Sequence, residues 1–207
     1  MSRLAPARVA RPSLLVGLWA PPLQTISSAR TSGPRLAALL KNAPLLPGTV
    51  NADLGGGAFE FGTAFLRGRD VQNIVYDPFN RSPHFNHDAV SRLQGGQAHS
   101  ATIANVLNVI REPSARHQLI LQAADVIGDH PGRSAYFSVY YDRSRPPGLT
   151  PYGWQEHRPL ATYAPEVAKV FREVSTANGI LTARDPRLHL LRPRRSSPRR
   201  ALRQDAA

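Results

Sequence analysis

The sequence predicts an α/β protein built on a doubly wound, mostly parallel sheet. Short apolar runs of strand length alternate with segments of helical periodicity between residues 48 and 183, and glycine or proline stands at most of the boundaries. Alternating elements of these lengths are typical of a parallel sheet with helices on both faces. The hydrophobic share of the chain, 42%, is enough for a packed core.

The first half of this domain is expected to hold three helices and three strands, which alternate along the chain. In each predicted element, the apolar residues recur at the spacing typical of a helix or of a strand. Gly68 and Gly95 mark the ends of two of the helices. In order, the predicted elements are a helix over 34–43, a strand over 48–54, a helix over 58–68, a strand over 73–77, a helix over 86–94 and a strand over 101–110.

The second half begins with a longer helix over 113–128, with Pro113 in its first turn. Its apolar side chains recur at helical spacing, for example at Leu119, Ile120 and Ala123. An aromatic-rich strand is predicted over 134–142, a helix from Pro165 to 174 and a last strand over 179–183.

The charge distribution divides the chain into three parts. The formal net charge is +12, yet residues 48–183 carry as many basic as acidic side chains. We therefore expect a disordered extension or leader over 1–32, a folded domain over 33–183 and a disordered basic tail over 184–207. The basic flanks are suited to non-specific contact with polyanions, whereas the neutral domain does not resemble a dedicated DNA-binding surface.

Neither composition nor hydropathy indicates a membrane protein or a thiol site. The apolar run over 13–23 is shorter than the ~20 residues that a membrane-spanning helix needs. The basic, acid-free leader is compatible with a weak signal peptide or transit peptide, but a disordered extension or a misassigned start is the simpler interpretation.

Cysteine is absent from the sequence, which excludes disulfides and cysteine nucleophiles. The expected location is cytoplasmic, and the oligomeric state is left open.

The stretch TVNADLGGGAFEFG at 49–62 is the strongest sign of a ligand site. Three glycines after a strand allow the backbone to approach a ligand closely, and loops at this position of a doubly wound sheet bind ligands. The loop lacks the Lys-Ser/Thr pair of a P-loop, and Glu60 stands where G-x-G-x-x-G would need glycine. Asp53 and Glu60 would repel a pyrophosphate, so a phosphate ligand is disfavoured.

The same acids suit a ligand that carries positive charge and no phosphate. S-adenosylmethionine has an ammonium and a sulfonium group, and Asp53 could hold the ammonium directly or through water. Asp77 ends the next strand, where a carboxylate can accept hydrogen bonds from both hydroxyls of a ribose. A tight strand–helix turn without a ligand remains the alternative for the glycine loop.

ADLGGG together with Asp77 resembles motifs I and II of class I S-adenosylmethionine-dependent methyltransferases. IVYDPFNRS and ANVLNVIRE also resemble a group of small, uncharacterised bacterial methyltransferases, some of which are associated with DNA phosphorothioation clusters. The resemblance covers residues 49–183 and implies a Rossmann-like class I methyltransferase fold with S-adenosylmethionine as the cofactor.

Several cofactor-binding residues follow from this resemblance. Asp53 with Gly55, Gly56 and Gly57 would form the methionine pocket, and Asp77 would take the ribose. Pro78 and Phe79 would lie near the adenine, and Asn105, at the end of the family's fourth strand, would lie nearest the transferred methyl group. 

One feature of the family is missing from the sequence. Many members carry an acid after the third strand that contacts the adenine amino group. The corresponding residues here include Gln97, His99 and Ser100 and no acid, so the adenine contact would pass to a side-chain amide or hydroxyl.

The acceptor is expected at the carboxyl edge of the sheet. Tyr141, at the end of the aromatic strand, is a candidate catalytic residue with Asn105, and Trp154, Gln155 and His157 are candidate substrate contacts. Packing roles for the tyrosine and the tryptophan remain an alternative. The loop after Asn105 lacks the prolines of amino-methylating DNA enzymes, and without cysteine the cytosine C5 route is closed.

No metal site is expected. His84, His87 and Asp88 have a spacing that a metal could use, but the ligand set is incomplete and residues 86–88 fit a helix N-terminus.

The preferred hypothesis is an S-adenosylmethionine-dependent methyltransferase acting on an unidentified acceptor. The first alternative is a catalytically inactive cofactor-binding protein with a regulatory or interaction role. The second is an NAD-type oxidoreductase, which the two acids of the loop disfavour.

Overall fold

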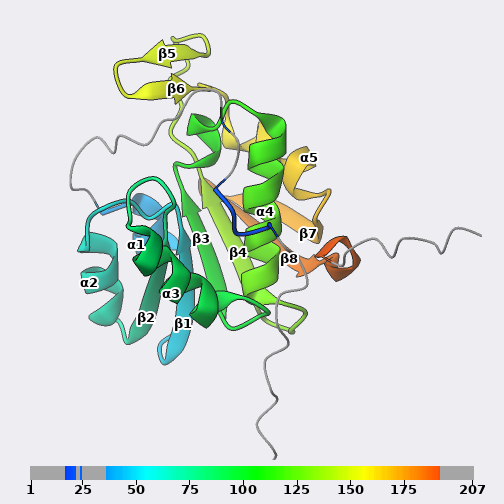
Figure 1. The fold of residues 1–207 in the computed structure, drawn as a ribbon. Coiled ribbons are helices and arrows are strands. Elements are labelled where there is room, and N and C mark those ends of the chain that lie inside the picture. Colours follow the sequence, from blue (N-terminus) through cyan, green and yellow to red (C-terminus); the bar gives the residue numbers. More distant parts are fainter. Residues whose placement is uncertain (1–16, 22–23, 25–35, 192–207) are drawn as a thin grey trace, which may run out of the picture.

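The computed structural model describes residues 17–21, 24 and 36–191. Its centre is a sheet of six strands in the order β2-β1-β3-β4-β8-β7 (Figure 1). The strands are β1 (Thr49–Leu54), β2 (Val71–Tyr76), β3 (Ser100–Ala104), β4 (Ser134–Ser138), β7 (Phe171–Ala177) and β8 (Ile180–Pro186). Strands β1 to β4 run parallel, and β8 and β7 are added in antiparallel pairing. The predicted α/β class and the mostly parallel sheet are confirmed.

Helices cover both faces of this sheet (Figure 1). The helices are α1 (Ala38–Asn42), α2 (Phe61–Arg67), α3 (Pro83–Leu93), α4 (Pro113–Ile127) and α5 (Ala164–Val167). On one face, α3 and α4 pack on the main core, while α1 and α2 supply Leu40 and Leu66 to a smaller cluster on the other. Because strand side chains alternate, Ala52 of β1 faces the main core and Asn51 and Asp53 face away from it.

The loops that matter for a ligand lie at the carboxyl ends of the parallel strands. Gly55 follows β1, Asp77 follows β2 and Asn105 follows β3. A small antiparallel hairpin of β5 (Gly148–Thr150) and β6 (Gly153–Gln155) follows β4 and stands above the same edge (Figure 1).

A short N-terminal segment, residues 17–20, packs on the folded part of the protein, although it lies within the range 1–32 that was predicted to be a disordered extension or a leader. Leu18 is buried in the main core. Trp19 packs edge-on against the Tyr76 ring, with ring centroids 4.9 Å apart. The Trp19 indole N–H donates to Asp125 over 3.1 Å, and the Tyr76 hydroxyl donates to the Trp19 carbonyl over 2.9 Å. Residues 17–20 therefore form a clasp across the helical face, hereafter the N-terminal clasp.

The predicted helix from Pro165 to 174 is wrong over most of its length. Helix α5 ends at Val167, and the chain enters β7 at Phe171. Strands β7 and β8 form a hairpin with Asn178 and Gly179 at its turn, at φ 52° and 73°. Asn-Gly is the preferred pair for a two-residue hairpin turn, because both residues tolerate positive φ. This local signal outweighs the weak helical periodicity of 165–174.

Several other boundaries differ from the predictions, among them three near the carboxyl edge of the sheet. Strands β3 and β4 end at Ala104 and Ser138, earlier than predicted, and a 3-10 helix η1 (Leu107–Val109) follows β3. Helix α3 begins at Pro83, with the Ser82 hydroxyl accepting from the Phe85 N–H, so residues 86–88 lie within the helix.

The folded part also continues past the predicted boundary at 183. Strand β8 runs to Pro186, and a 3-10 helix η3 (Leu188–Leu191) places Leu191 in the core. The rest of the predicted tail and most of 1–32 lie outside the described residues. Within the described part, no helix is long and apolar enough to cross a bilayer.

Candidate functional site

The glycine loop after β1 is packed too tightly for any other residue at two positions. A Cβ at Gly55, which has φ 81°, would lie 2.6 Å from Val106. A Cβ at Gly56 would lie 2.7 Å from Asp53 Oδ2 and 3.0 Å from Val75. The glycines are thus needed where this loop meets Asp53 and the loop after β3.

Asp53 lies within a chain of buried polar side chains that crosses β1, β2 and β3. Its carboxylate accepts hydrogen bonds from Thr102 over 3.3 Å and from Asn73 over 3.4 Å. Asn51 donates to both of these neighbours, over 2.9 Å to Thr102 and 2.8 Å to Asn73. Sequence reasoning found Asp53 but missed this network, whose only sign was polar residues inside strand-like runs.

Burial raises the pKa of Asp53 to about 6, against the lowering effect of its hydrogen bonds from Asn73 and Thr102. The side chain is 4% exposed. A cationic group beside this carboxylate would favour its ionised form and would in turn be bound more tightly.

Asp77 stands directly after β2 and is also buried. One oxygen, Oδ2, accepts the Gly57 N–H over 2.9 Å and joins the glycine loop to the end of β2. The other, Oδ1, accepts the N–H groups of Phe79 and Asn80, each over 3.0 Å. The Asn80 side-chain amide donates to both oxygens at 3.1 Å. Asn80 was not predicted.

Arg81 fastens the glycine loop from the other side. Its Nε donates to the Gly57 carbonyl over 2.7 Å, and its guanidinium also reaches the Phe59 carbonyl and the Glu60 carboxylate. The hydrogen bond from Arg81 lowers the pKa of Glu60. Because Arg81 neutralises the charge of Glu60, Glu60 would repel a phosphate ligand less than the sequence alone suggested. The electrostatic argument against a phosphate ligand therefore rests on Asp53.

Gln97, His99 and Ser100, which were expected to replace the missing adenine-binding acid, lie at the opposite end of the sheet, whereas Pro78 and Phe79 follow β2 at the edge of the glycine loop. Strand β3 is the third along the chain and pairs directly with β1, with Ser100 opposite Asn51. The Ser100 hydroxyl is used in a hydrogen bond to Asn51 Oδ1, and His99 precedes the strand. Gln97, His99 and Ser100 are therefore not near the glycine loop. Asn105 follows β3, the third strand along the described part of the chain, whereas a fourth strand was expected before it.

The expected catalytic residues follow β3 and β4 on adjacent loops. Asn105 is exposed and has φ 58°, a strained conformation for a residue other than glycine, and its N–H donates to Ser138 O over 2.9 Å. Tyr140 and Tyr141 follow β4 and are 58% and 39% exposed.

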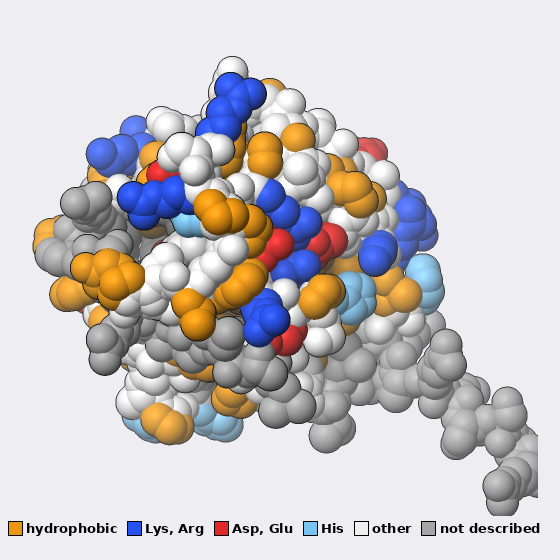
Figure 2. Space-filling model, turned by 90° about the horizontal axis from the view of Figure 1, so that it is seen from above, with side chains coloured by type: hydrophobic (Ala, Val, Ile, Leu, Met, Phe, Trp, Pro, Cys, Tyr) orange, Lys and Arg blue, Asp and Glu red, His pale blue; other side chains and the backbone are white. Residues whose placement is uncertain are grey.

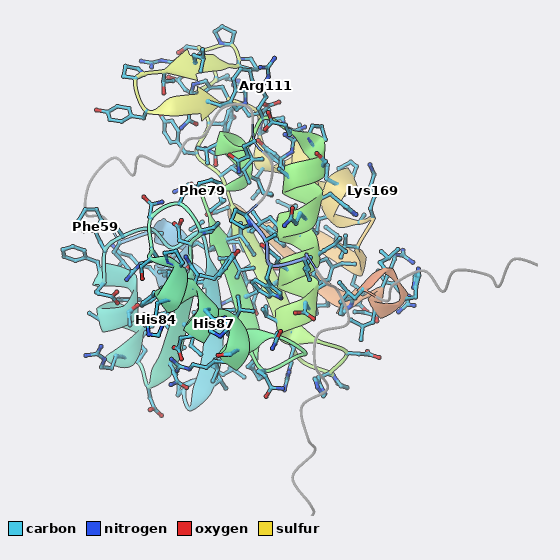
Figure 3. All side chains as sticks on the ribbon, viewed as in Figure 1. Phe59, Phe79, His84, His87, Arg111 and Lys169 are labelled. Carbon is cyan, nitrogen blue, oxygen red and sulfur yellow. The ribbon has the colours of Figure 1, made fainter. Side chains whose placement is uncertain are left out.

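Seen from above, the surface at this edge carries hydrophobic side chains next to basic (arginine or lysine) and acidic ones (Figure 2). Phe59 and Phe79 lie below the hairpin on the same side, and Arg111 lies beside the hairpin (Figure 3).

The hairpin brings two of the predicted substrate residues to this edge. Gln155 accepts a hydrogen bond from the buried Asn108 side chain over 3.1 Å, and Trp154 lies under the guanidinium of Arg111, 5.1 Å from its ring centre. Among the described residues, Asn108 Oδ1 is buried without a hydrogen-bond partner. The Trp154 indole N–H donates to Glu156 over 2.8 Å.

His157 stands close to Tyr140, with ring centroids 6.4 Å apart. Its Nδ1 accepts the Asp142 N–H over 3.3 Å. Because Nδ1 is engaged in this hydrogen bond, His157 is not placed to act as a base through Nδ1, and Nε2 is the ring nitrogen left for a ligand.

An ion-pair cluster that sequence reasoning missed ties this edge to the body of the protein. Glu166 of α5 receives two hydrogen bonds from Arg116 of α4, over 2.7 and 3.1 Å, and another from Arg158. Burial would raise the pKa of Glu166, but the two arginines lower it overall. The pairs join residues 8 and 50 positions apart, and no local pattern predicts the longer one.

Two other features carry no predicted site residue. His84 and His87 lie on α3 (Figure 3), and no group of three or more potential metal ligands occurs in the described part of the chain. A hollow of about 410 Å³ lies beside α2 and the start of β2, lined by Thr63, Arg67, Asp70, Val71, Gln72, Asn73 and Arg92. It is at the amino end of the strands, away from the glycine loop.

The structure is similar to that of 1,6-didemethyltoxoflavin-N1-methyltransferase from Burkholderia thailandensis, solved with bound 1,6-didemethyltoxoflavin and S-adenosylhomocysteine. The match has a TM-score of 0.50 and 18% identity and covers 68% of this chain and 72% of the other. A TehB-like SAM-dependent methyltransferase from Corynebacterium glutamicum matches at a TM-score of 0.39 and 11% identity, over 70% and 83% of the two chains.

A candidate Zn-dependent alcohol dehydrogenase from Rhodobacter sphaeroides matches at a TM-score of 0.45 and 11% identity, over 72% and 89%. No protein-family model matches the chain, and no curated protein matches it by sequence. The fold is that of a Rossmann-like class I methyltransferase domain.

Proposed function

We propose that the protein is an S-adenosylmethionine-dependent methyltransferase. The observation that carries this proposal is Asp53, an acid with a raised pKa that stands at the end of β1 against Gly56. A pyrophosphate on the glycine loop would meet this carboxylate at close range, whereas an ammonium group would be attracted to it.

Asp77 and the glycine loop fit the rest of that cofactor. A carboxylate after the second strand can accept hydrogen bonds from a ribose diol, and the narrow loop favours contact with backbone. When bound, S-adenosylmethionine would supply an electrophilic methyl group, which the acceptor nucleophile takes in line while the neutral thioether of S-adenosylhomocysteine leaves. Because the likeness to solved methyltransferases is at 18% identity or below, it supports the fold, and the cofactor is inferred from these side chains.

The protein's part in catalysis would be alignment of the acceptor. Asn105 and Tyr141 stand on the loops after β3 and β4, at the same edge as the glycine loop. Trp154, Gln155 and His157 would contact the acceptor from the hairpin and the loop after it. We propose a small acceptor in the cytoplasm. The exposed aromatic side chains at this edge, including Tyr140 and Phe79, favour one with a flat apolar part.

The test is calorimetric titration of the full chain with S-adenosylmethionine, S-adenosylhomocysteine and NAD. We expect binding of the first two but not of NAD, and a loss of at least about 100-fold in affinity in Asp77→Ala. Asp88→Ala, which removes an exposed acid of α3, is the matched control and should bind normally. Binding of NAD alone, or of none of the three, would overturn the proposal.

Methyl transfer has to be measured separately, because an inactive cofactor-binding protein would pass the titration. Labelled S-adenosylmethionine is incubated with the chain and a set of small aromatic amines, phenols and heterocycles. Transfer that is lost in Asn105→Ala, with cofactor affinity retained, would support an enzyme and would assign Asn105 to the acceptor side.

A further inference from the structure

We propose that Asn80 competes with the cofactor for Asp77, and that Arg81 holds the glycine loop in its closed position. This inference rests on the proposed function and adds to it two residues that regulate access. Both belong to the turn between β2 and α3, residues 77–82, hereafter the closing turn.

Asn80 occupies the side of Asp77 that a vicinal diol would use. Its amide nitrogen lies 3.1 Å from each oxygen of Asp77, so one N–H of the amide is shared between both oxygens of the carboxylate. The two neighbouring hydroxyls of a ribose donate to both oxygens of a carboxylate and would need the same position. The Asn80 side chain therefore takes the place at Asp77 that the ribose of a bound cofactor would take.

The remaining capacity of Asp77 is also used. Oδ1 accepts the Phe79 and Asn80 N–H groups and Oδ2 accepts the Gly57 N–H, which brings the carboxylate to five donor contacts in all. An ionised carboxylate offers about four lone-pair sites. A ribose can therefore hydrogen-bond to Asp77 only if a contact is given up, and the Asn80 side chain is the one that can rotate away.

Arg81 closes the other side of the loop. It bonds to the Gly57 and Phe59 carbonyls and to the Glu60 carboxylate, and its side chain is 10% exposed. The guanidinium also lies over the Phe85 ring of α3, 4.7 Å from its centre. The loop from Gly55 to Glu60 is thus fastened to the closing turn at both of its sides, by Asp77 and by Arg81.

Two consequences follow for binding. Removal of the Asn80 amide frees the outer lone pairs of Asp77 and should tighten binding of any ligand with a ribose diol. Loss of the Arg81 guanidinium should loosen the glycine loop even without a ligand, because three of its anchoring contacts are lost.

The first experiment compares the full chain with Asn80→Ala, using 5′-methylthioadenosine and its 2′,3′-dideoxy counterpart as probes in calorimetry. We expect Asn80→Ala to bind 5′-methylthioadenosine roughly 3- to 10-fold more tightly, which corresponds to one released hydrogen bond, and the dideoxy compound with unchanged affinity. His84→Ala, an exposed change on the neighbouring helix, is the control. Equal or weaker binding of 5′-methylthioadenosine by Asn80→Ala would overturn the role of Asn80 while leaving the proposed function intact. No binding by either protein would also overturn the role of Asn80, while the proposed function would still stand or fall by the titration with S-adenosylmethionine.

The second experiment needs no cofactor. Hydrogen–deuterium exchange of residues 54–60 is compared in the unmodified chain, in Arg81→Ala and in Arg92→Ala, which removes an exposed arginine of α3. Exchange that is about ten-fold faster in Arg81→Ala only would support the closing contact. Unchanged exchange in Arg81→Ala would show that Arg81 does not hold the loop.

Discussion

The two halves of the carboxyl edge are built in different ways. The cofactor half, formed by the loops after β1 and β2, is held by hydrogen bonds among side chains that lie on neighbouring strands or within one turn, such as Asp53, Asn73 and Asp77. The acceptor half, formed by the loops after β3 and β4 and by the hairpin, is held by ion pairs that join distant elements, with Glu166 at their centre. The cofactor half is therefore held by many contacts between neighbours in the sheet and its turns, and the acceptor half by a few contacts between distant elements.

The strongest test of this difference is Arg116→Ala. Arg116 is 4% exposed and makes two hydrogen bonds to Glu166 and two to the carbonyls of Ile110 and Arg111. Removal of one partner from a buried ion pair costs about 3–5 kcal/mol of the free energy of unfolding. Urea unfolding measures this loss, and hydrogen exchange at residues 153–158 should increase.

The cofactor half should not respond to that change. We expect the affinity of Arg116→Ala for S-adenosylhomocysteine to stay within about three-fold of the unmodified chain, because no contact of Arg116 reaches the glycine loop. A variant of unchanged stability that loses cofactor affinity would show that the two halves are coupled.

The second prediction concerns the N-terminal clasp, which lies against the cofactor half. Trp19→Ala removes the ring contact with Tyr76 and leaves Asp125, whose pKa burial already raises, without its indole donor. We expect a loss of about 2–4 kcal/mol in the free energy of unfolding. A truncation that starts at residue 33 should lose at least as much. Trp154→Phe, on the hairpin, is the control and should cost less than about 1 kcal/mol.

The sequence made the cofactor half predictable because its signals are local. A glycine loop after an apolar strand, an acid before it and an acid at the end of the next strand are all visible within 29 residues, from Thr49 to Asp77. The parallel sheet followed from the same alternation. The contacts of Asn80 and Arg81 could not be predicted, because an Asn-Arg pair occurs in many kinds of turn. Only the structure shows that Asn80 donates to Asp77 and that Arg81 donates to the glycine loop.

The acceptor half and the clasp could not be predicted in the same way. The link between Arg116 and Glu166 spans 50 positions, and Trp19 meets Asp125 across 106. No periodicity encodes such pairs. The β7–β8 hairpin is different, since Asn178-Gly179 is a local turn signal in the sequence and outweighs the helical pattern that precedes it.

The third prediction uses the buried charge of Asp53. Its pKa is raised from 3.8 to about 6, so the folded protein binds this proton more tightly than the unfolded chain does. Ionised Asp53 therefore lowers stability, by an amount that grows from pH 3.8 to about 6 and stays constant above it. Asp53→Asn should raise the free energy of unfolding by up to about 3 kcal/mol at pH 8 and by much less at pH 4.

The same substitution should abolish S-adenosylmethionine binding, because the neutral amide does not attract the ammonium group. Stability and binding would then change in opposite directions, as expected where a functional charge is buried at a cost. A variant that is destabilised at pH 8 would instead assign Asp53 a structural role. Thr102→Val, which removes one donor to Asp53, is a useful comparison and should raise the pKa of Asp53 further.

The smallest effect on stability is expected at the tip of the hairpin. Tyr152 and Leu149 are 57% and 69% exposed, and Tyr152→Ala should change the free energy of unfolding by less than about 0.5 kcal/mol. Cofactor affinity should also stay the same, because the hairpin lies above the edge and not on the glycine loop (Figure 1). If exposed aromatic groups hold the acceptor, the variant should raise the KM for the acceptor in the labelled-methyl assay and leave kcat nearly unchanged. A fall in kcat with constant KM would mean that the hairpin orders the catalytic loops and does not bind the acceptor. The acceptor half would then be a preorganised site, like the cofactor half.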